Sequence, residues 1–345
     1  TTSIEAETME VEDTTSIEIE ESTAVAIVEE VKEPTKHIVV FNTTPLIDAV
    51  TVLSANIKNN LAIEALSCIL FNVNSKDNCT LTTTNLNDYV SIDIDTIDTN
   101  NTGGTFLVEA KILNKILKSV GSSATITFEV QGNNVKLISG KTTWDIESLE
   151  VDEFPNDHFD LGESFVDCTL NYDDVKSIVH NALPFTSDDE LRPALQGVLL
   201  SFKDNQMTVV STDAYRLAVI KINSKINIGI DGQLILHPNT VIALKNCLKS
   251  LPKSDSVTIK LSKDQNGGLF KTNVFSLNAG RFCITSQVVD ARYPNYSAVI
   301  PNEECFTNKI VFNKEVIVAA LNKVLITSNK TCPKVSFCMT GKDLL

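Results

Sequence analysis

The residues best equipped for chemistry lie together in Ser211 to Val219, "STDAYRLAV". A hydroxyl, a carboxylate, a phenol and a guanidinium follow one another between two strand-like segments. Catalysis would need a base, a nucleophile or a metal nearby. The histidines stand apart, without a nucleophile motif, a phosphate-cradling glycine loop or a Cys/His cluster, at His37, His158, His180 and His237. The sequence therefore favours a binding role over an enzyme, and it predicts no metal site and no cofactor.

Cysteine usage indicates a reducing compartment. Eight cysteines are scattered along the chain, and the closest pair, Cys332 and Cys338, lacks the spacing of a zinc knuckle. Buried, reduced thiols are the expectation, as in a cytosol-like environment. No apolar run approaches the ~20 residues of a membrane span, and no secretory signal opens the chain. The sequence thus predicts a soluble protein that is not exported.

Lysines recur on the outer face of two predicted helices. One helix follows Val108 and carries its lysines at i, i+4 and i+7, namely Lys111, Lys115 and Lys118, opposite the apolar residues Ile112, Leu113, Ile116, Leu117 and Val120. The other follows His237 and sets Lys245 and Lys249 opposite Val241, Leu244, Leu248 and Leu251. Each face alone is typical of a solvated amphipathic helix. Two such faces in an acidic protein also indicate a basic surface for a polyanion.

The elements that position these residues belong to more than one domain. A chain of 345 residues suggests two or three domains of roughly 100 to 150 residues each. The net charge is −15, and the segment Thr1–Lys36 supplies −9 of it through eleven acidic residues against two lysines. This segment has no aromatic residue, and its composition predicts a disordered tail, which either solubilises the chain or binds a partner.

An internal repeat organises the rest of the chain. A strand followed by an amphipathic helix starts at His37, recurs at Phe165 and starts again at Asn308. "ALSCILFNV" from Ala65 aligns with "ALQGVLLSF" from Ala194 at an offset of 129, and each of these two copies continues into period-2 strands and a second helix. The pattern predicts tandem α+β domains of mostly antiparallel sheet with two helices each.

Three motifs resemble one known family. "RPALQGVLLSFKDNQMTVVSTDAYRLAVIKI" (Arg192 to Ile222) is similar to the middle-domain core of the bacterial sliding clamp, the beta subunit of DNA polymerase III holoenzyme. "VVDARYPNYSAVIP" (Val288 to Pro301) resembles the family's linker to the last domain, and "EVDEFPNDHFD" (Glu150 to Asp160) its first domain junction. The resemblance runs from about His37 to the end, with the motifs in the family's order.

The resemblance implies a processivity factor. Like-folded domains form a crescent that pairs head to tail into a homodimeric ring, with helices inside around duplex DNA and sheets outside. Its implied domains are clamp domain 1 at 37–162, clamp domain 2 at 163–302 and the beginning of a third at 303–345, which covers about forty residues of a longer unit. The cellular location that the resemblance implies is the cytoplasm, at the nucleoid. A ring that slides needs weak, numerous and sequence-blind phosphate contacts, which suits lysines on the helices of an acidic protein.

The resemblance also implies a hydrophobic pocket for short peptides of the polymerase and the clamp loader. Matching positions are Leu195, Thr212, Ala214, Tyr215, Arg216, Leu217, Pro294 and Val299. Apolar residues would accept the anchoring side chains, and polar groups at the rim would fix the register. For Asp213 two alternatives remain open, because it can serve the pocket or form a structural pair with Arg216 that holds the turn.

The implied DNA-facing residues are Lys58, Lys111, Lys115, Lys118, Arg192, Lys245 and Lys249, and the implied dimer contacts are Trp144 and Ile146 against Ile326. Trp144 can alternatively fill the core. The chain departs from the family where Pro193 and Ala194 replace aromatic residues, and at Asn60 and Ala298, where basic residues are usual. The competing hypothesis is a binding scaffold that uses the same fold without encircling DNA.

Overall fold

The structure is a computed structural model, and it describes residues 36–57, 63–74, 78–100, 103–122, 124–155, 159, 165–224, 226, 231–253, 255–262, 274–306, 309–328, 335–337, 339–340 and 343–344. The segment predicted to be a disordered tail lies outside the described residues, except for Lys36. The chain divides into two compact units, Thr1–Thr83 with Ile92–Asn156, and Thr84–Ser91 with Asp157–Leu345. None of the helices among the described residues has the length and apolar character needed to cross a bilayer.

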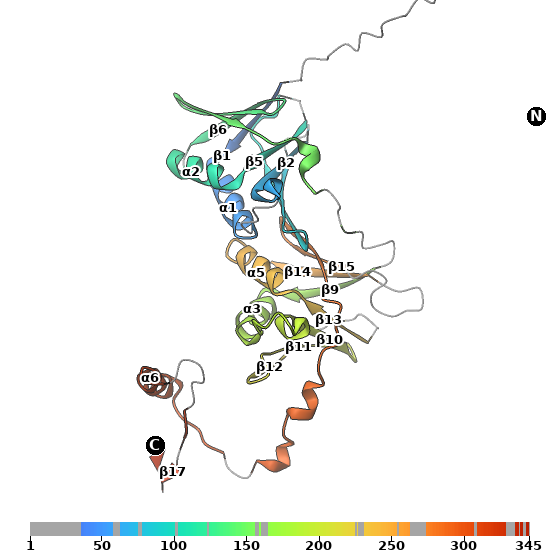
Figure 1. Cartoon of the computed structure of the whole chain (residues 1–345), viewed down its shortest axis with the longest axis vertical. Coiled ribbons are helices and arrows are strands. Elements are labelled where there is room, and N and C mark those ends of the chain that lie inside the picture. Colours follow the sequence, from blue (N-terminus) through green and yellow to red (C-terminus); the bar gives the residue numbers. More distant parts are fainter. Residues whose placement is uncertain are drawn as a thin grey trace, which may run out of the picture. The chain divides into compact units, whose positions relative to one another are not determined.

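The first unit contains two antiparallel sheet layers and two helices (Figure 1). Its strands follow the orders β1-β6-β7-β8 and β5-β2-β3-β4. The helices α1 and α2 pack against each other. In chain order the elements are β1 His37–Asn42, α1 Thr43–Ser54, η1 Glu64–Ser67, β2 Cys68–Asn74, β3 Asn78–Thr84, β4 Asp88–Asp95, β5 Gly104–Glu109, α2 Ala110–Val120, β6 Thr125–Gln131, β7 Asn134–Ser139, β8 Thr142–Glu147 and η2 Val151–Glu153.

The second unit repeats this order of elements, which confirms the repeat predicted from the sequence. Its strands follow the orders β9-β14-β15-β16 and β13-β10-β11-β12, the same connectivity as in the first unit. Its elements are β9 Phe165–Asn171, α3 Tyr172–Asn181, η3 Leu183–Phe185, α4 Pro193–Gln196, β10 Val198–Lys203, β11 Gln206–Thr212, β12 Leu217–Lys221, β13 Gly232–Leu236, α5 Pro238–Cys247, β14 Ser256–Ser262, β15 Val274–Ala279, β16 Phe282–Gln287 and η4 Tyr296–Val299.

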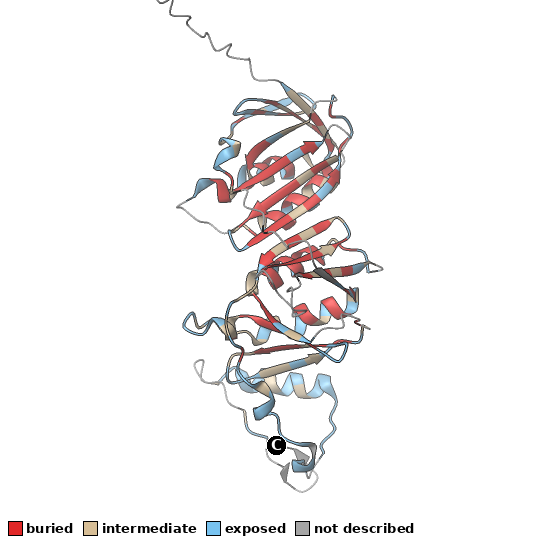
Figure 2. Ribbon diagram, turned by 90° about the vertical axis from the view of Figure 1, so that its right-hand side faces the viewer, coloured by how far each residue is buried: buried red, intermediate tan, exposed pale blue. Residues whose placement is uncertain are grey.

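Aromatic packing fills the core of the first unit. Phe41, Phe71, Phe106 and Phe128 are buried, at 3% exposure or less. The rings of Phe71 and Phe106 stack with centroids 4.9 Å apart, and Phe41 meets Phe128 edge to face at 5.2 Å. Such pairs add about 0.5–1.5 kcal/mol each beyond the burial of their area. The buried residues, coloured red, are concentrated in the strands and helices of the two units (Figure 2).

The second helix of each unit follows its sequence pattern. In α2, Leu113, Ile116 and Leu117 are buried while the lysines are exposed, and Gly121 closes the helix at a φ of 82°. Ile112, predicted to be buried, is 37% exposed, because it lies at the border of the apolar stripe. The four apolar positions predicted for the second helix of the other unit are all buried, but only Val241 and Leu244 lie in α5, while Leu248 and Leu251 follow its end.

Two places in the second unit depend on close contacts. Gly197 lies against β13, where an added Cβ would come within 2.2 Å of Ile235 Cγ2. Gly280, at a φ of 57°, turns the chain between β15 and β16, so the sequence stretch from Val274 to Ser286 forms a hairpin.

The buried carboxylate of Asp174 accepts hydrogen bonds from the backbone N–H groups of Asn223 (3.2 Å) and Ser224 (2.9 Å).

The segment Thr84–Ser91 belongs to the second unit although the first unit surrounds it in sequence, so β4 starts in the second unit at Asp88 and continues in the first unit from Ile92. Its Asp88 has no exposed surface. One carboxylate oxygen accepts hydrogen bonds from the hydroxyls of Thr240 (2.5 Å) and Ser286 (2.6 Å), and the other accepts from the Asn85 side-chain amide (3.0 Å). A buried carboxylate requires such partners.

Among its described residues, the third copy of the repeat forms the predicted helix but not the strand before it. Lys314–Leu325 is helical (α6), and Asn313 caps it by accepting from the N–H groups of Glu315 and Val316. The strand predicted before it is wrong, since residues 309–313 are not in a strand. A strand needs a hydrogen-bonded neighbour, and the described residues provide none there. All of α6 is exposed or half-buried, as its pale blue and tan colours show (Figure 2). Short elements near it are η5 Glu303–Cys305, β17 Met339–Thr340 and β18 Asp343–Leu344.

The cysteine prediction is confirmed in part. Cys68, Cys79, Cys168 and Cys247 are free and buried. Cys305 is free but exposed, so the expectation of burial is wrong there. Cys332 and Cys338 lie outside the described residues.

Candidate functional site

Within Ser211 to Val219, residues 213–216 form the turn between β11 and β12. The Thr212 hydroxyl donates to the Arg216 carbonyl (2.6 Å) and accepts from the Ala214 N–H (3.1 Å). One oxygen of Asp213 accepts from the N–H groups of Tyr215 (2.9 Å) and Arg216 (2.8 Å). These bonds hold Ala214 at a φ of 74°, a conformation that costs a non-glycine residue roughly 1–2 kcal/mol. Thr212 and Asp213 therefore shape the turn.

Arg216 ties this turn to the segment after α3. Its guanidinium donates to the second oxygen of Asp213 from Nη2 (2.7 Å) and from Nε (3.0 Å), and it donates to the Pro184 carbonyl (3.3 Å). It also lies 5.3 Å from the centre of the Phe185 ring, within the range of a cation–π contact. The structural pair of Asp213 with Arg216 is therefore present, and a role of Asp213 in the pocket stays a prediction.

The pKa of Asp213 reflects this geometry. Burial of the carboxyl group acts to raise its pKa. The hydrogen bonds from the Arg216 side chain and from the N–H groups of Arg216 and Tyr215 outweigh burial and hold the pKa below its usual range. Asp213 is therefore ionised at neutral pH and keeps its pair with Arg216.

Apolar residues beside the turn form a cluster that includes one predicted pocket residue. Leu199, Val210, Ile235 and Tyr293 are buried together, with Leu217 packed against them. Ala194, Val289, Ala291 and Tyr296 also pack against this cluster. The structure thus brings β12 together with the linker segment Val288–Pro301. Burial raises the pKa of the Tyr293 phenol to about 12, so the phenol is neutral.

The other predicted pocket residues differ in exposure. Leu195 is 8% exposed, whereas Tyr215 and Val299 are 91% and 69% exposed, and Ala214 and Pro294 are also exposed. A small cavity of about 200 Å³ adjoins the cluster on its β13 side, but none of the predicted pocket residues lines it. Tyr293 and Tyr296, which pack in the same cluster as Leu217, were not among the predicted residues. Their position in the "RYPNYS" motif was the available signal.

The lysines of α2 face solvent beside a groove. Lys111, Lys115 and Lys118 are exposed and line a cavity of about 540 Å³ together with Thr51, Ser54, Ala55, Ile57, Ser67, Glu109, Ala110 and Asn114. The ion pairs seen among the described residues involve none of the three lysines. Their charges are therefore available to a polyanion.

The basic residues of the second unit are arranged differently. Lys245 and Lys249 are exposed, and the Lys249 ammonium group donates to the Asn246 side chain (3.0 Å). Lys111 is the second residue of its helix, whereas Lys245 is the eighth of α5. Lys249 lies beyond the end of α5, so α2 carries three exposed lysines whereas α5 carries one, and the predicted lysine face of the second helix is wrong in this respect.

Arg192 precedes α4, and its Nε donates to Asp189 (2.7 Å). This hydrogen bond lowers the pKa of Asp189, so the carboxylate compensates part of the arginine charge. Lys58 and Asn60 lie outside the described residues.

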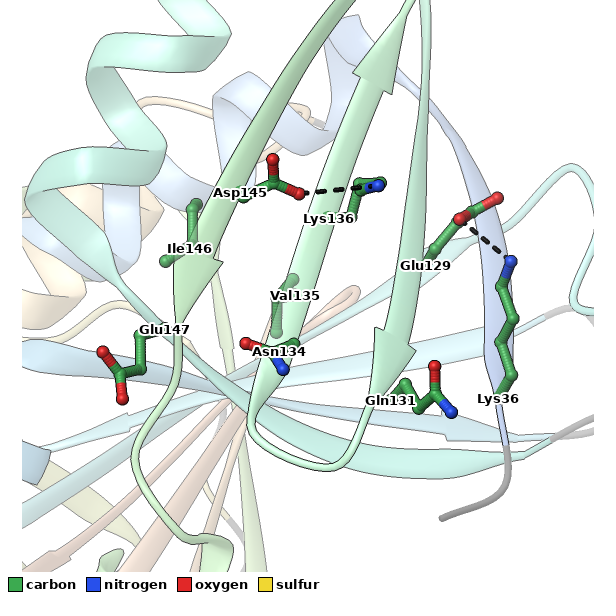
Figure 3. A pocket seen from close by; sticks show the side chains of 9 residues that line it. All are labelled: Lys36, Glu129, Gln131, Asn134, Val135, Lys136, Asp145, Ile146 and Glu147. Carbon is green, nitrogen blue, oxygen red and sulfur yellow. Dashed lines mark ion pairs between the residues drawn. The ribbon is translucent and has the colours of Figure 1, made fainter. Parts of the chain in front are cut away.

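The predicted dimer residues lie on β8 and at the end of α6. In the sheet order of the first unit, β8 is an edge strand. Trp144 is half-buried opposite Leu137 of β7, and Ile146 is buried opposite Val135. Ile326 is 82% exposed. A cavity of about 580 Å³ lies over this sheet, crossed by the ion pairs Lys36–Glu129 (3.0 Å) and Lys136–Asp145 (3.7 Å) (Figure 3).

In the described part of the chain, histidine, cysteine and carboxylate side chains do not gather in threes as a metal site would require. His237 instead accepts a hydrogen bond from the Asn239 N–H at the start of α5 (3.2 Å), and His158 lies outside the described residues.

Two family models match the two units. Residues 37–158 match the N-terminal domain of the DNA polymerase III beta subunit, and residues 169–295 match its central domain. The chain belongs to the beta sliding clamp family. The order of the two matches is the order of the repeats described above.

Relatives support this family assignment. The beta sliding clamp of Proteus mirabilis is 24% identical over 241 residues, which cover 70% of this chain and 62% of that protein. The beta sliding clamp of Buchnera aphidicola is 25% identical over 293 residues, which cover 84% of this chain and 75% of the relative. The chain therefore spans about three-fifths to three-quarters of the length of these clamps.

Solved clamps share the fold. A DnaN sliding clamp from Pseudomonas aeruginosa bound to griselimycin superposes with a TM-score of 0.75 at 19% identity, covering 86% of this chain and 76% of that one. The DNA polymerase III beta subunit of Thermotoga maritima gives 0.71 at 22% identity, covering 84% and 74%. The tandem α+β clamp domains predicted from the sequence are thus confirmed.

Proposed function

We propose that this chain is a DNA polymerase processivity factor, a non-catalytic clamp protomer that contributes to a ring around duplex DNA. Membership of the sliding clamp family carries the proposal, together with the exposed lysines that lie on α2 and on or just after α5. Binding would be independent of sequence, because exposed lysines contact phosphates and read no base edges.

The parts of the chain would share this work. We assign 37–162 and 163–302 to the first two clamp domains and 303–345 to the beginning of a third, with the acidic tail before them. Lys111, Lys115, Lys118, Arg192, Lys245 and Lys249 would face DNA, with Lys58 as a further candidate. Trp144 and Ile146 would meet Ile326 of a second copy in a homodimer, and the protein would work in the cytoplasm at the nucleoid.

The turn between β11 and β12 would serve partner proteins. Leu217 packs beside Tyr293, next to the structured turn of Thr212 and Arg216, which supports a site for short hydrophobic motifs of the polymerase and the clamp loader. Leu195, Ala214, Tyr215, Pro294 and Val299 complete the proposed site. The clamp from Pseudomonas aeruginosa binds griselimycin, which supports ligand binding by the family's fold.

A topological assay tests the proposal. The protein is loaded with a clamp loader and ATP onto nicked circular DNA, isolated by gel filtration, and the circle is then cut once. We expect retention on the circle and loss after linearisation, because only a topological link is released through free ends. K111E/K115E/K245E/K249E should lose retention, whereas K141E/K203E, at exposed lysines outside the helices, should keep it.

The outcomes distinguish a ring around DNA from the competing hypothesis, a scaffold of the same fold that does not encircle DNA. Equal retention on circular and linear DNA would contradict encirclement. Binding of a clamp-loader peptide that is lost in Leu217→Glu, without retention on circles, would favour a scaffold of the same fold. Light scattering of the same preparation gives the number of copies in the assembly.

A further inference from the structure

The groove beside α2 combines a basic rim with an apolar floor. Lys111, Lys115 and Lys118 are exposed along it, while Ile57, Ala55 and Ala110 contribute apolar surface. Glu109 is the one carboxylate among its lining residues, so the rim is net positive.

The chain itself contains a segment of the opposite charge. Residues 1–35 carry eleven carboxylates and a single lysine, Lys32. In "SIEIEES", from Ser16, glutamates alternate with isoleucines, which provides charge for a lysine rim and apolar side chains for a floor. A DNA backbone carries the same negative charge as this acidic segment, so either of them could bind the lysine rim.

The tether places this acidic segment close to the groove. Residue 36 leads directly into β1 of the same unit, and β1, six residues long, spans about 20 Å. A random coil with as many residues as this segment would have a root-mean-square span of roughly 30 Å. Such a tether gives an effective concentration in the millimolar range, so weak electrostatic attraction is sufficient for docking.

We infer that residues 5–33 dock in the α2 groove as an intramolecular acidic ligand and compete there with polyanions. The docked segment shields the three lysines until a stronger polyanion displaces it. The docking contact itself is independent of the proposed function, whereas its use to restrain DNA binding rests on that function.

Zero-length cross-linking of the full chain tests the contact. A carbodiimide at low ionic strength joins carboxylates to neighbouring amines, and mass spectrometry maps the links. We expect links from residues 5–33 to Lys111, Lys115 and Lys118 to exceed those to the exposed Lys141 and Lys203 several-fold. They should vanish near 1 M salt, where the screening length is about 3 Å. Links spread evenly over all exposed lysines would overturn the inference.

A charge-neutral variant tests the competition. In the full chain, the eleven acidic residues of the segment are changed to their amides, and binding of a short linear duplex is measured by anisotropy. We expect affinity to rise roughly ten-fold at low salt, because phosphate contacts are strongly salt-dependent. In the K111Q/K115Q/K118Q background the rise should disappear, and in K141Q/K203Q it should persist.

These readouts separate two failures. An equal rise in all backgrounds would mean general charge repulsion and would overturn docking. Site-specific cross-links without retention on circular DNA would leave docking in place and reject the ring. Retention on circular DNA together with evenly spread cross-links would support the ring and reject docking.

Discussion

At the residue scale, Asp213 decides the shape of the proposed partner site. It accepts two backbone hydrogen bonds with one oxygen and pairs with Arg216 through the other. Asp213→Ala removes both functions, and we expect it to lower the free energy of unfolding by about 1–2 kcal/mol. Asp213→Asn keeps an acceptor for the turn and should cost less than about 1 kcal/mol, because the pair is partly exposed. Urea unfolding measures both, with Asp188→Ala in the exposed loop as a control.

The same pair predicts a dependence on pH. The folded-state pKa of Asp213 lies below the ordinary value of 3.8. The contribution of the pair is therefore fully present above that value and is lost as the pH falls through the lower folded-state pKa. The stability difference between the wild type and Asp213→Asn should be constant from pH 5 to 7 and shrink below about pH 4. A difference that grew on acidification would contradict the assigned direction.

Cysteine reactivity should follow burial. Burial raises the pKa of the Cys68 thiol to about 11 and those of Cys168 and Cys247 to about 12, so these thiols stay protonated and inaccessible. Alkylation of the native protein near pH 8, mapped by mass spectrometry, should modify Cys305 before the buried cysteines among the described residues. The buried thiols should react only after unfolding in urea. Labelling of Cys168 at the rate of Cys305 in the native state would contradict this expectation.

Sequence reasoning found the turn but not all of its neighbours. Thr212, Asp213 and Arg216 stand together in the sequence, so their types already suggested a shared site. Tyr293 meets Leu217 only through the fold, about eighty residues away, and a local pattern cannot show such a contact. The exposure of Tyr215 and the pairing of Arg192 with Asp189 also depend on tertiary geometry.

At the element scale, α6 differs from the other long helices. It has twelve residues, and none of them is buried. Isolated helices shorter than about 12–15 residues are marginal in water. Hydrogen exchange followed by mass spectrometry should therefore show amides of α6 exchanging at least about a hundred-fold faster than those of α5, whose apolar face is packed. Equal protection of the two helices at a concentration where the protein is monomeric would show that α6 has a packing partner in this chain.

The periodic elements were the most predictable part of the fold. Apolar spacing located α2 and α5, because their buried stripes follow the helical repeat. The prediction of a strand before α6 was wrong for a different reason. Its apolar residues satisfy the pattern, but a strand also requires a neighbour, which the pattern of one segment does not contain. Ile112 shows a similar limit, because the helical spacing places it at the border of the apolar face of α2 but does not determine whether a neighbour covers it.

At the scale of the whole molecule, the two units have separate cores. Leu113 has no exposed surface in the first unit, and Leu113→Ala should cost about 2–5 kcal/mol there. Hydrogen exchange along a urea series should show protection lost first in 36–83 and 92–155, while 165–262 stays protected. Lys111→Ala, on the exposed side of the same helix, should change stability by less than about 0.5 kcal/mol. Simultaneous loss in both units would mean that they unfold as one cooperative body.

The segment Thr84–Ser91 determines how this protein can be divided or recombined. A fragment that ends in the linker after Asn156 takes Asp88 with it and removes the acceptor that Thr240 and Ser286 require. The second half expressed alone would lose the bonds of both hydroxyls to Asp88 and keep the contact of the two hydroxyls with each other (2.9 Å), at a cost of about 0.5–1.5 kcal/mol for each lost bond. A chimaera built from two relatives would therefore have to inherit these eight residues together with the half downstream, so the natural unit of exchange is discontinuous in sequence.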